Sequence, residues 1–547
     1  MEHLVARFSG DVHPGDVFIV NDPDEGGMHL PDVFLIKPVF FAGTLGGYVA
    51  CVAHYPDIGG RVAGGNAFDS TDIFQEGLQI PLIKLYDRGR LDESFLRVLL
   101  RNVRIPDVVH GDLQAQLAAC HVGESGLLEL HGRYGTEGLE RRMKDVLAYT
   151  EQRIVNELRR LPEGHYSFVD YIDDDGFGSG PIAIEVALHL AGGRLEADFS
   201  GTSPQVRSAL NATMSFTKAA VYAAVRCVVS DDIPSNSGFY RPIEVRAPRG
   251  SILNPERPAP RAARGLTGYR TFDTVLAAFA QICPDRVPAA GDGGASMIAI
   301  TGQHRGGEPF ILVDFMTGGW GARPDADGPD GNSPIAANLS NVPIEDIEAR
   351  FPIRVQRYGL VADTGGAGRF RGSLSVEREY RLVGVDGLLQ VRSDRQHHLP
   401  GGLGGGAAGS PSANVLDPDT PGCTRLAGNV VVPISAGQVF RHVTAGGGGF
   451  GPAAERDRQL VAEDVLDGKL TPQHAARAYG LVLGAAAGEV AVGQPRVGQT
   501  PAGTTPADQS PADQSPAGTT LPCQPPAVPA TVRAGGDSPT SAGRPAR

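Results

Sequence analysis

The sequence has few cysteines, and their placement excludes two common kinds of framework. Its 547 residues include six cysteines, widely scattered and with no CxxC pair among them: Cys51, Cys120, Cys227, Cys283, Cys423 and Cys523. Zinc ribbons need closely paired cysteines, and disulfide-stapled domains are short and cysteine-dense. We therefore expect neither a zinc ribbon nor a disulfide framework, and we expect a reducing compartment, the cytoplasm.

Long apolar runs and an excess of basic residues are also missing. No apolar run approaches the roughly 20 residues that span a bilayer, and Glu2 and His3 open the chain in place of a basic and apolar leader. The formal net charge of -13 disfavours nucleic acid as a partner. We expect a soluble cytoplasmic protein with no membrane and no nucleic-acid partner. A metal cation or a basic partner surface would suit its charge better.

The glycine clusters at 401–409 and 446–449 carry no nucleotide-binding signature. Neither has the lysine of GxxxxGK[ST], and neither forms a strand–GxGxxG–helix unit followed by an acidic residue. We expect no ATP site in this chain, so that any ATP used is bound by another polypeptide.

What the sequence has in abundance is glycine, at 73 residues, which favours a β-rich body with many turns. We predict an α+β fold: a β-rich, glycine-rich, multi-layer catalytic body over residues 1–490 and a disordered tail over 492–547. The tail consists mostly of Pro, Ala, Gly, Thr and Ser, contains a five-residue repeat (PAGTT or PADQS) over 501–520, and has too few large apolar groups to order. Within the body we predict short strands over 1–90, a helical segment over 92–161, and a mixed β-rich region over 166–490.

Two periodic patterns inside the body predict particular elements. Apolar residues alternate from Ile182 to Leu190, and Gly192-Gly193 follows, which predicts a hairpin. Ala-rich amphipathic runs predict helices over 217–227 and 272–282, and shorter helices are expected over 460–470 and 475–481.

One short phrase occurs twice near the start of the chain. His29-Leu30-Pro31-Asp32 and His54-Tyr55-Pro56-Asp57 each follow or adjoin a short apolar run that suits a buried strand. Proline lacks an amide donor and ends a strand ladder, so each phrase is expected on a loop at the mouth of a strand. Two neighbouring strands would then bring two imidazoles and several carboxylates to one place.

Two imidazoles and one carboxylate form a set that binds Mn, Fe or Zn on one face and leaves positions open for water or substrate. We assign His29, Asp32 and His54 to this metal site, with Asp57 or Asp22 as orienting residue or catalytic base. The alternative is that the histidines cap strand ends and the aspartates bind turn amides. Residues alone leave both interpretations open.

Eight phrases along the chain resemble the hydantoinase B family, in the order that the family has them. They run from about Gly15 to Tyr479: NDPDEGGMHLPDV, AHYPDIGG, IFQEGLQIPLIKLY, NVRIPDVVHGDLQAQLAA, DFSGTSPQVRSALNAT, EARFPIRVQRYGL, DTGGAGRFRG and TAGGGGFG. The family comprises a subunit or half of ATP-dependent hydantoinases and 5-oxoprolinases, and the alpha subunit of acetone-type carboxylases. In the carboxylase branch the matching segments bind Mn, and their ligands fall on His29, Asp32 and His54.

The resemblance implies a metal-dependent cyclic-amide hydrolase that opens hydantoin or 5-oxoproline rings with a hydantoinase A-type partner. The partner would bind ATP and phosphorylate the amide oxygen, and the two chains would form a hetero-oligomer. An acetone-type carboxylase is the alternative in another reaction class.

Three departures from the family pattern support a third possibility, an inactive truncated scaffold protein. Family members usually carry several dozen further residues before Gly15, including an expected carboxylate ligand, so we expect either that the start of this sequence is misplaced or that the site is incomplete. Asp24 stands where an aromatic residue is usual, and Met28 stands where a threonine is usual.

Two further features are candidates for ligand binding. Glu76 matches the family's FQEG phrase and is expected to line a pocket beside the two histidine phrases. A run of arginines in an acidic protein is a candidate contact for a phosphorylated intermediate or a partner, with ordinary exposed strand residues as the alternative: Arg350, Arg354, Arg357, Arg369, Arg371 and Arg378.

Overall fold

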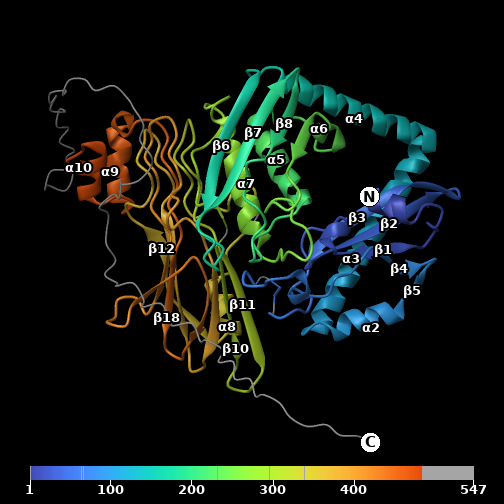
Figure 1. Cartoon of the computed structure of the whole chain (residues 1–547), viewed down its shortest axis with the longest axis horizontal. Coiled ribbons are helices and arrows are strands. Elements are labelled where there is room, and N and C mark those ends of the chain that lie inside the picture. Colours follow the sequence, from blue (N-terminus) through green and yellow to red (C-terminus); the bar gives the residue numbers. More distant parts are fainter. Residues whose placement is uncertain are drawn as a thin grey trace, which may run out of the picture.

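The computed structural model describes residues 2–62, 64–65, 67–230, 232–294, 296–337 and 339–482. In this part of the chain four sheets and ten α-helices form an α+β fold, as predicted (Figure 1). The predicted tail over 492–547 lies outside the described residues. None of the described helices is both long and apolar enough to cross a bilayer.

The N-terminal unit is an antiparallel sheet with strand order β3-β2-β1-β4-β5. Ile19 and Leu35 point from this sheet into a core that also contains Leu113 of helix α3. The sheet is therefore covered on one face by the helical segment that follows it in sequence. Its elements are α1 (Glu2–Arg7), β1 (Val17–Val20), η1 (Pro23–Glu25), β2 (Asp32–Phe41), β3 (Thr44–His54), η2 (Ile73–Gln75), β4 (Ile83–Asp87) and β5 (Arg90–Leu91).

The predicted helical segment forms three helices, α2 (Glu93–Arg101), α3 (Pro106–Tyr134) and α4 (Thr136–Leu158). Asp92 caps α2 by accepting a hydrogen bond from the Phe95 amide at 3.0 Å. Proline in the first turn starts α3, where its missing N–H has no partner to lose. Helix α4 then runs from the N-terminal unit to the second sheet (Figure 1).

The second sheet has the order β6-β7-β8-β9 and packs against α5 and α7. The predicted hairpin is present: β7 and β8 meet at Gly192-Gly193, whose φ angles of +60° and +77° favour glycine. The elements are β6 (Gly164–Ile172), β7 (Ile182–Ala191), β8 (Arg194–Asp198), α5 (Met214–Val228), α6 (Ser237–Tyr240), β9 (Ile243–Arg246) and α7 (Arg264–Phe279).

Helix α7 begins eight residues earlier than the sequence predicted, at Arg264 in place of Phe272. Its first half contains arginine and threonine, yet Thr267 and Thr271 are fully buried. The Thr271 hydroxyl donates to the Thr267 carbonyl oxygen one turn back at 2.8 Å, and the Thr267 hydroxyl donates to the Leu210 carbonyl oxygen, so both polar groups are satisfied. Apolar periodicity therefore missed this half, which places Arg264 in the first turn.

The C-terminal half contains two antiparallel sheets with a shared core that includes Ile300, Tyr380, Leu389 and Phe440. One sheet has β10 (Ser296–Gln303), β11 (Pro309–Met316), β14 (Gly387–Arg392) and β17 (Asn429–Ile434). The other has β12 (Ile353–Val361), β13 (Ser375–Leu382), β15 (Ala413–Leu416), β16 (Thr424–Leu426) and β18 (Val439–Val443). The remaining elements are α8 (Ile344–Arg350), η3 (Ala453–Glu455), α9 (Arg458–Leu466) and α10 (Pro472–Tyr479).

Glycine-rich segments of this half pack backbone against backbone. The Gly366 amide donates to the Gly447 carbonyl oxygen at 2.8 Å, and similar bonds join neighbouring segments. A Cβ added to Gly402 would lie 2.1 Å from the Gly406 carbonyl oxygen, so no other residue fits there. The glycine clusters at 401–409 and 446–449 thus serve packing.

Candidate metal centre

The two histidine phrases meet at one end of the N-terminal sheet. Asp32 is the first residue of β2 and His54 is the last residue of β3, and the two are cross-strand partners. His29 lies in the turn before β2, where its carbonyl oxygen accepts a hydrogen bond from the Asp32 amide at 2.9 Å. One ligand atom from each of the three residues lies within 4.8 Å of the others. The strand placement predicted from sequence therefore brings His29, Asp32 and His54 together.

His29 is buried, and its side chain has a strongly shifted pKa. Its residue surface is 1% exposed, and neither ring nitrogen has a hydrogen-bond partner among the described residues. Desolvation, followed by the charges of Arg264, His54 and Arg392, holds its pKa well below the usual value. The ring is therefore neutral at physiological pH and keeps a lone pair available.

The other histidine behaves in the same way. Desolvation lowers the pKa of His54, although the Asp32 carboxylate acts in the opposite direction. The two rings lie with centroids 5.5 Å apart, and His29 Nδ1 is 3.9 Å from Asp32 Oδ2. His54 is exposed, so one side of the cluster is open to solvent.

This donor set fits a divalent transition metal. Two neutral imidazoles and one carboxylate, open on one side, are the ligands that Mn, Fe and Zn accept with room for water. Buried polar atoms without partners are unfavourable, and coordination would satisfy a nitrogen of His29.

Arg264, in the first turn of α7, extends the cluster from another part of the chain. Its guanidinium donates from Nη2 to Asp32 Oδ2 at 2.5 Å. The guanidinium carbon also lies 5.4 Å from the Phe216 ring centroid, a cation–π contact. Arg264 thus fixes the orientation of the proposed metal-binding carboxylate, as a residue behind a metal ligand does.

Arg392, the last residue of β14, also acts on the cluster. It is 3% exposed, and its guanidinium makes no hydrogen bond or ion pair within the described chain. A Cβ on Gly265 would lie 3.9 Å from its Nη2 and 3.8 Å from the Tyr269 ring, so the guanidinium lies beside the start of α7. Burial lowers the pKa of Arg392 to about 10, which still leaves it charged at neutral pH.

Glu76 is buried close to Arg264. Its Oε1 accepts hydrogen bonds from the Arg261 and Ala262 amides, at 2.6 Å and 2.8 Å. Desolvation nevertheless raises the pKa of Glu76 to about 8. The residue is therefore mostly protonated at pH 7 and does not neutralise the neighbouring arginines.

Comparison with known proteins identifies the family. A sequence model of the hydantoinase B/oxoprolinase family matches residues 1–453. The chain belongs to this family. It is 34% identical over 491 residues to the putative B component of a D-/L-hydantoinase from Pseudomonas sp. (strain NS671), covering 86% of this chain and 81% of that one. It is 31% identical over 497 residues to the beta subunit of caprolactamase from Pseudomonas jessenii, covering 88% and 84%.

Solved structures agree with this assignment. The crystal structure of ATP-dependent caprolactamase from Pseudomonas jessenii matches with a TM-score of 0.83 and 27% identity, covering 90% of this chain and 86% of that one. A nucleotide-free acetone carboxylase structure matches with a TM-score of 0.81 at 19% identity, covering 89% and 72%, and shows the shared fold.

Asp57 and Asp22, which were predicted as catalytic base or orienting residue, form hydrogen bonds with residues other than the proposed metal ligands. Asp57 is buried, and Oδ1 accepts hydrogen bonds from the Gly59 amide (3.1 Å) and Arg104 Nη1 (2.9 Å). Its Oδ2 accepts the main-chain amide of Arg104. These contacts tie the second histidine phrase to the segment between α2 and α3. The catalytic role of Asp57 stays a prediction.

Asp22 also binds groups outside the cluster of proposed metal ligands. Its Oδ1 accepts the Asp24 amide at 2.9 Å and caps η1, and its Oδ2 lies 3.3 Å from Arg257 Nη1. Neither Asp22 nor Asp57 belongs to the group of ligand atoms formed by the two histidines and Asp32. The role of Asp22 as a base likewise stays a prediction.

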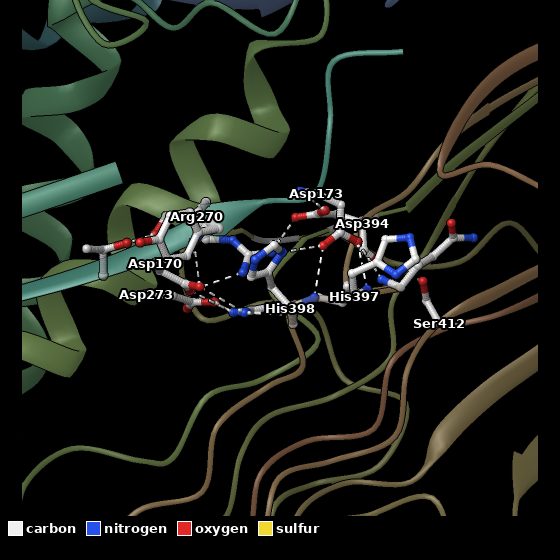
Figure 2. A network of polar contacts seen from close by, with 12 residues as sticks. Asp170, Asp173, Arg270, Asp273, Asp394, His397, His398 and Ser412 are labelled. Carbon is white, nitrogen blue, oxygen red and sulfur yellow. Dashed lines mark hydrogen bonds and ion pairs between the residues drawn. The ribbon is translucent and has the colours of Figure 1, made fainter. Parts of the chain in front are cut away.

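A buried polar network holds α7 against the end of β14 (Figure 2). Arg270 of α7 donates to Asp170 Oδ2 at 3.0 Å and to Asp394 Oδ2 at 2.5 Å. Arg395 pairs with the same Asp170 oxygen at 3.1 Å. Because Asp394 and Arg395 closely follow Arg392, this network joins the second turn of α7 to the residues just after β14. It therefore sets the position of Arg392 relative to Arg264.

Sequence reasoning found the two histidines, Asp32 and Glu76 but missed Arg264 and Arg392. No motif marks either arginine, since each reaches the site through long-range packing. The arginines singled out over 350–378 instead pair with carboxylates of this chain, as Arg378 does with Asp314 and Arg371 with Asp330.

Proposed function

We propose that this chain is the metal-dependent component of an ATP-dependent cyclic-amide hydrolase, which opens a hydantoin or 5-oxoproline ring together with a hydantoinase A-type partner. Relatives named as hydantoinase, caprolactamase and 5-oxoprolinase support the reaction class. The observation that carries the proposal is the convergence of His29, Asp32 and His54, with neither His29 nitrogen hydrogen-bonded within the described chain.

His29, Asp32 and His54 would hold the divalent metal, with manganese as first choice and zinc or iron as alternatives. Such an ion, when bound, lowers the pKa of a water molecule so that hydroxide is available at neutral pH. The chain itself supplies neutral imidazoles and a carboxylate oriented by Arg264. Leu30 and Tyr55, which directly follow the two histidines in sequence, are buried in the core of the N-terminal unit.

ATP use is assigned to the partner. An amide is a poor electrophile, and phosphorylation of its oxygen creates a leaving group. This chain has no GxxxxGK[ST] segment, and its glycine clusters serve packing. The proposed division of work is therefore activation by the partner and hydrolysis in this chain.

Metal analysis of the purified complex, together with ATP-dependent turnover, tests the proposal. We expect His29→Ala and His54→Ala to lose the metal and the ring opening of 5-oxoproline or hydantoins. His121→Ala is the matched control because its side chain on α3 is 74% exposed and far in sequence from the cluster. Unchanged metal content in both site variants would remove the site assignment. Carboxylation of acetone instead of ring opening would favour the carboxylase reaction.

A further inference from the structure

Arg392 differs from every other buried arginine in the described part of the chain. Eight arginines there are buried, and seven of them form ion pairs with aspartate or glutamate: Arg261, Arg270, Arg371, Arg378, Arg395, Arg441 and Arg456. Arg392 has no carboxylate partner among the described residues, and it makes a cation–π contact with the Phe315 ring, whose centroid lies 5.8 Å from the guanidinium carbon. It is a buried charge that the described chain does not compensate.

A second guanidinium lies nearby, that of Arg264. The added-Cβ position on Gly265, one residue after Arg264, is 3.9 Å and 4.0 Å from the two amino groups of Arg392. Arg264 uses one amino group for Asp32, and its Nε has no partner among the described residues. Both arginines also influence His29 electrostatically. The two cations thus border the proposed metal ligands.

Such an arrangement is unfavourable unless an anion joins it. Burying a charge without a partner is costly, and like charges add repulsion. The planar guanidinium presents donors in a fork that matches the oxygens of carboxylate or phosphate. The chain also keeps its two arginines in place through the network around Arg270 and Asp394 (Figure 2).

We propose that Arg392 and Arg264 form an oxyanion subsite beside His29, Asp32 and His54, which binds a phosphate or carboxylate group of the substrate or its activated form. The identity of that molecule rests on the proposed function. Under that function the anion is either the phosphate placed on the amide oxygen or a carboxylate already present on the ring, as in 5-oxoproline.

Anion binding by the purified complex tests the subsite without requiring turnover. Inorganic phosphate and 5-oxoproline serve as probes, and calorimetric affinity and thermal stabilisation are measured. We expect Arg392→Met to weaken binding of one probe by about tenfold or more, as loss of a charged hydrogen bond does. Without an anion the variant should be at least as thermostable as the wild type, because an unpaired buried charge has been removed.

Arg381→Met is the control because this arginine is exposed on a neighbouring sheet, and Arg392→Lys keeps the charge should the methionine variant fold poorly. We expect the control to bind like the wild type and the lysine variant to bind between the wild type and Arg392→Met. Loss of phosphate binding would identify the activated substrate as the source, and loss of 5-oxoproline binding alone would identify the substrate carboxylate. The subsite is overturned if the wild type binds neither probe, or if neither Arg392 variant weakens binding. Because metal content is measured on the same samples, failure of the subsite is distinguishable from failure of the metal centre.

Discussion

The raised pKa of Glu76 can be tested quantitatively through the pH dependence of protein stability. Its carboxyl is buried and its pKa is raised from an ordinary 4.5 to about 8, chiefly because burial disfavours the charged form. The folded state therefore holds the proton more tightly than the unfolded chain does. Stability is unaffected below pH 4.5, falls as pH rises between 4.5 and 8, and stays reduced above pH 8.

Glu76→Gln should remove this pH dependence. Glutamine has the shape of the protonated acid, and its carbonyl oxygen can still accept the amides of Arg261 and Ala262. One pKa unit corresponds to about 1.4 kcal/mol, so the stability of the variant relative to the wild type should increase by about 3–4 kcal/mol between about pH 5 and about pH 8.

Urea unfolding at about pH 5, 6.5 and 8, with a chelator present to exclude metal effects, measures this difference. Glu140→Gln is the control because its side chain on α4 is 58% exposed, and it should show no comparable trend with pH. If the difference between Glu76→Gln and the wild type were the same at all three pH values, Glu76 would not be held protonated by the fold.

Two further substitutions separate structural roles from catalytic ones. Gly402→Ala should destabilise the chain by about 1–3 kcal/mol, as overpacking does, because its Cβ would lie 2.1 Å from a carbonyl oxygen. The control is Gly401→Ala, whose Cβ would meet no atom within 4 Å. Equal melting temperatures for the two variants would contradict this prediction. Asp57→Asn should lower the free energy of unfolding by about 1–3 kcal/mol through loss of charged hydrogen bonds to Arg104. Unchanged stability together with lost turnover would instead support the role of Asp57 as a base.

The N-terminal part of the site was predictable because its signals are local. A strand pair joined by a short turn brings Asp32 and His54 opposite each other, and the apolar runs before each phrase are visible in the sequence. Arg264 and Arg392 were not predictable, since α7 and β14 reach the site through contacts between segments distant in sequence, such as that of Arg264 with Asp32. The start of α7 was also hidden, because Thr267 and Thr271 interrupt the apolar pattern, although both are buried and their hydroxyls are hydrogen-bonded.

For glycine, too, the sequence predicted a local property but not the long-range packing. An abundance of glycine correctly indicated a body with many turns, as at Gly192. It did not indicate that other glycines, such as Gly372, lie where a Cβ would be 1.9 Å from a neighbouring main-chain oxygen. Close approach of chain segments distant in sequence is a tertiary property, and no local pattern encodes it.

The charges around the centre link the metal site to the oxyanion subsite. Both histidines are neutral and Glu76 keeps its proton at pH 7, and Asp32 pairs with Arg264, so Arg392 has no compensating carboxylate among the described residues and the site carries an excess of positive charge. A divalent cation would add to that charge in a largely buried space, where repulsion is poorly screened. An anion held by Arg392 would reduce that repulsion, and by linkage each ligand should then strengthen the binding of the other. If both proposals hold, metal affinity measured with inorganic phosphate present should exceed that measured without it, and equal affinities would contradict the coupling.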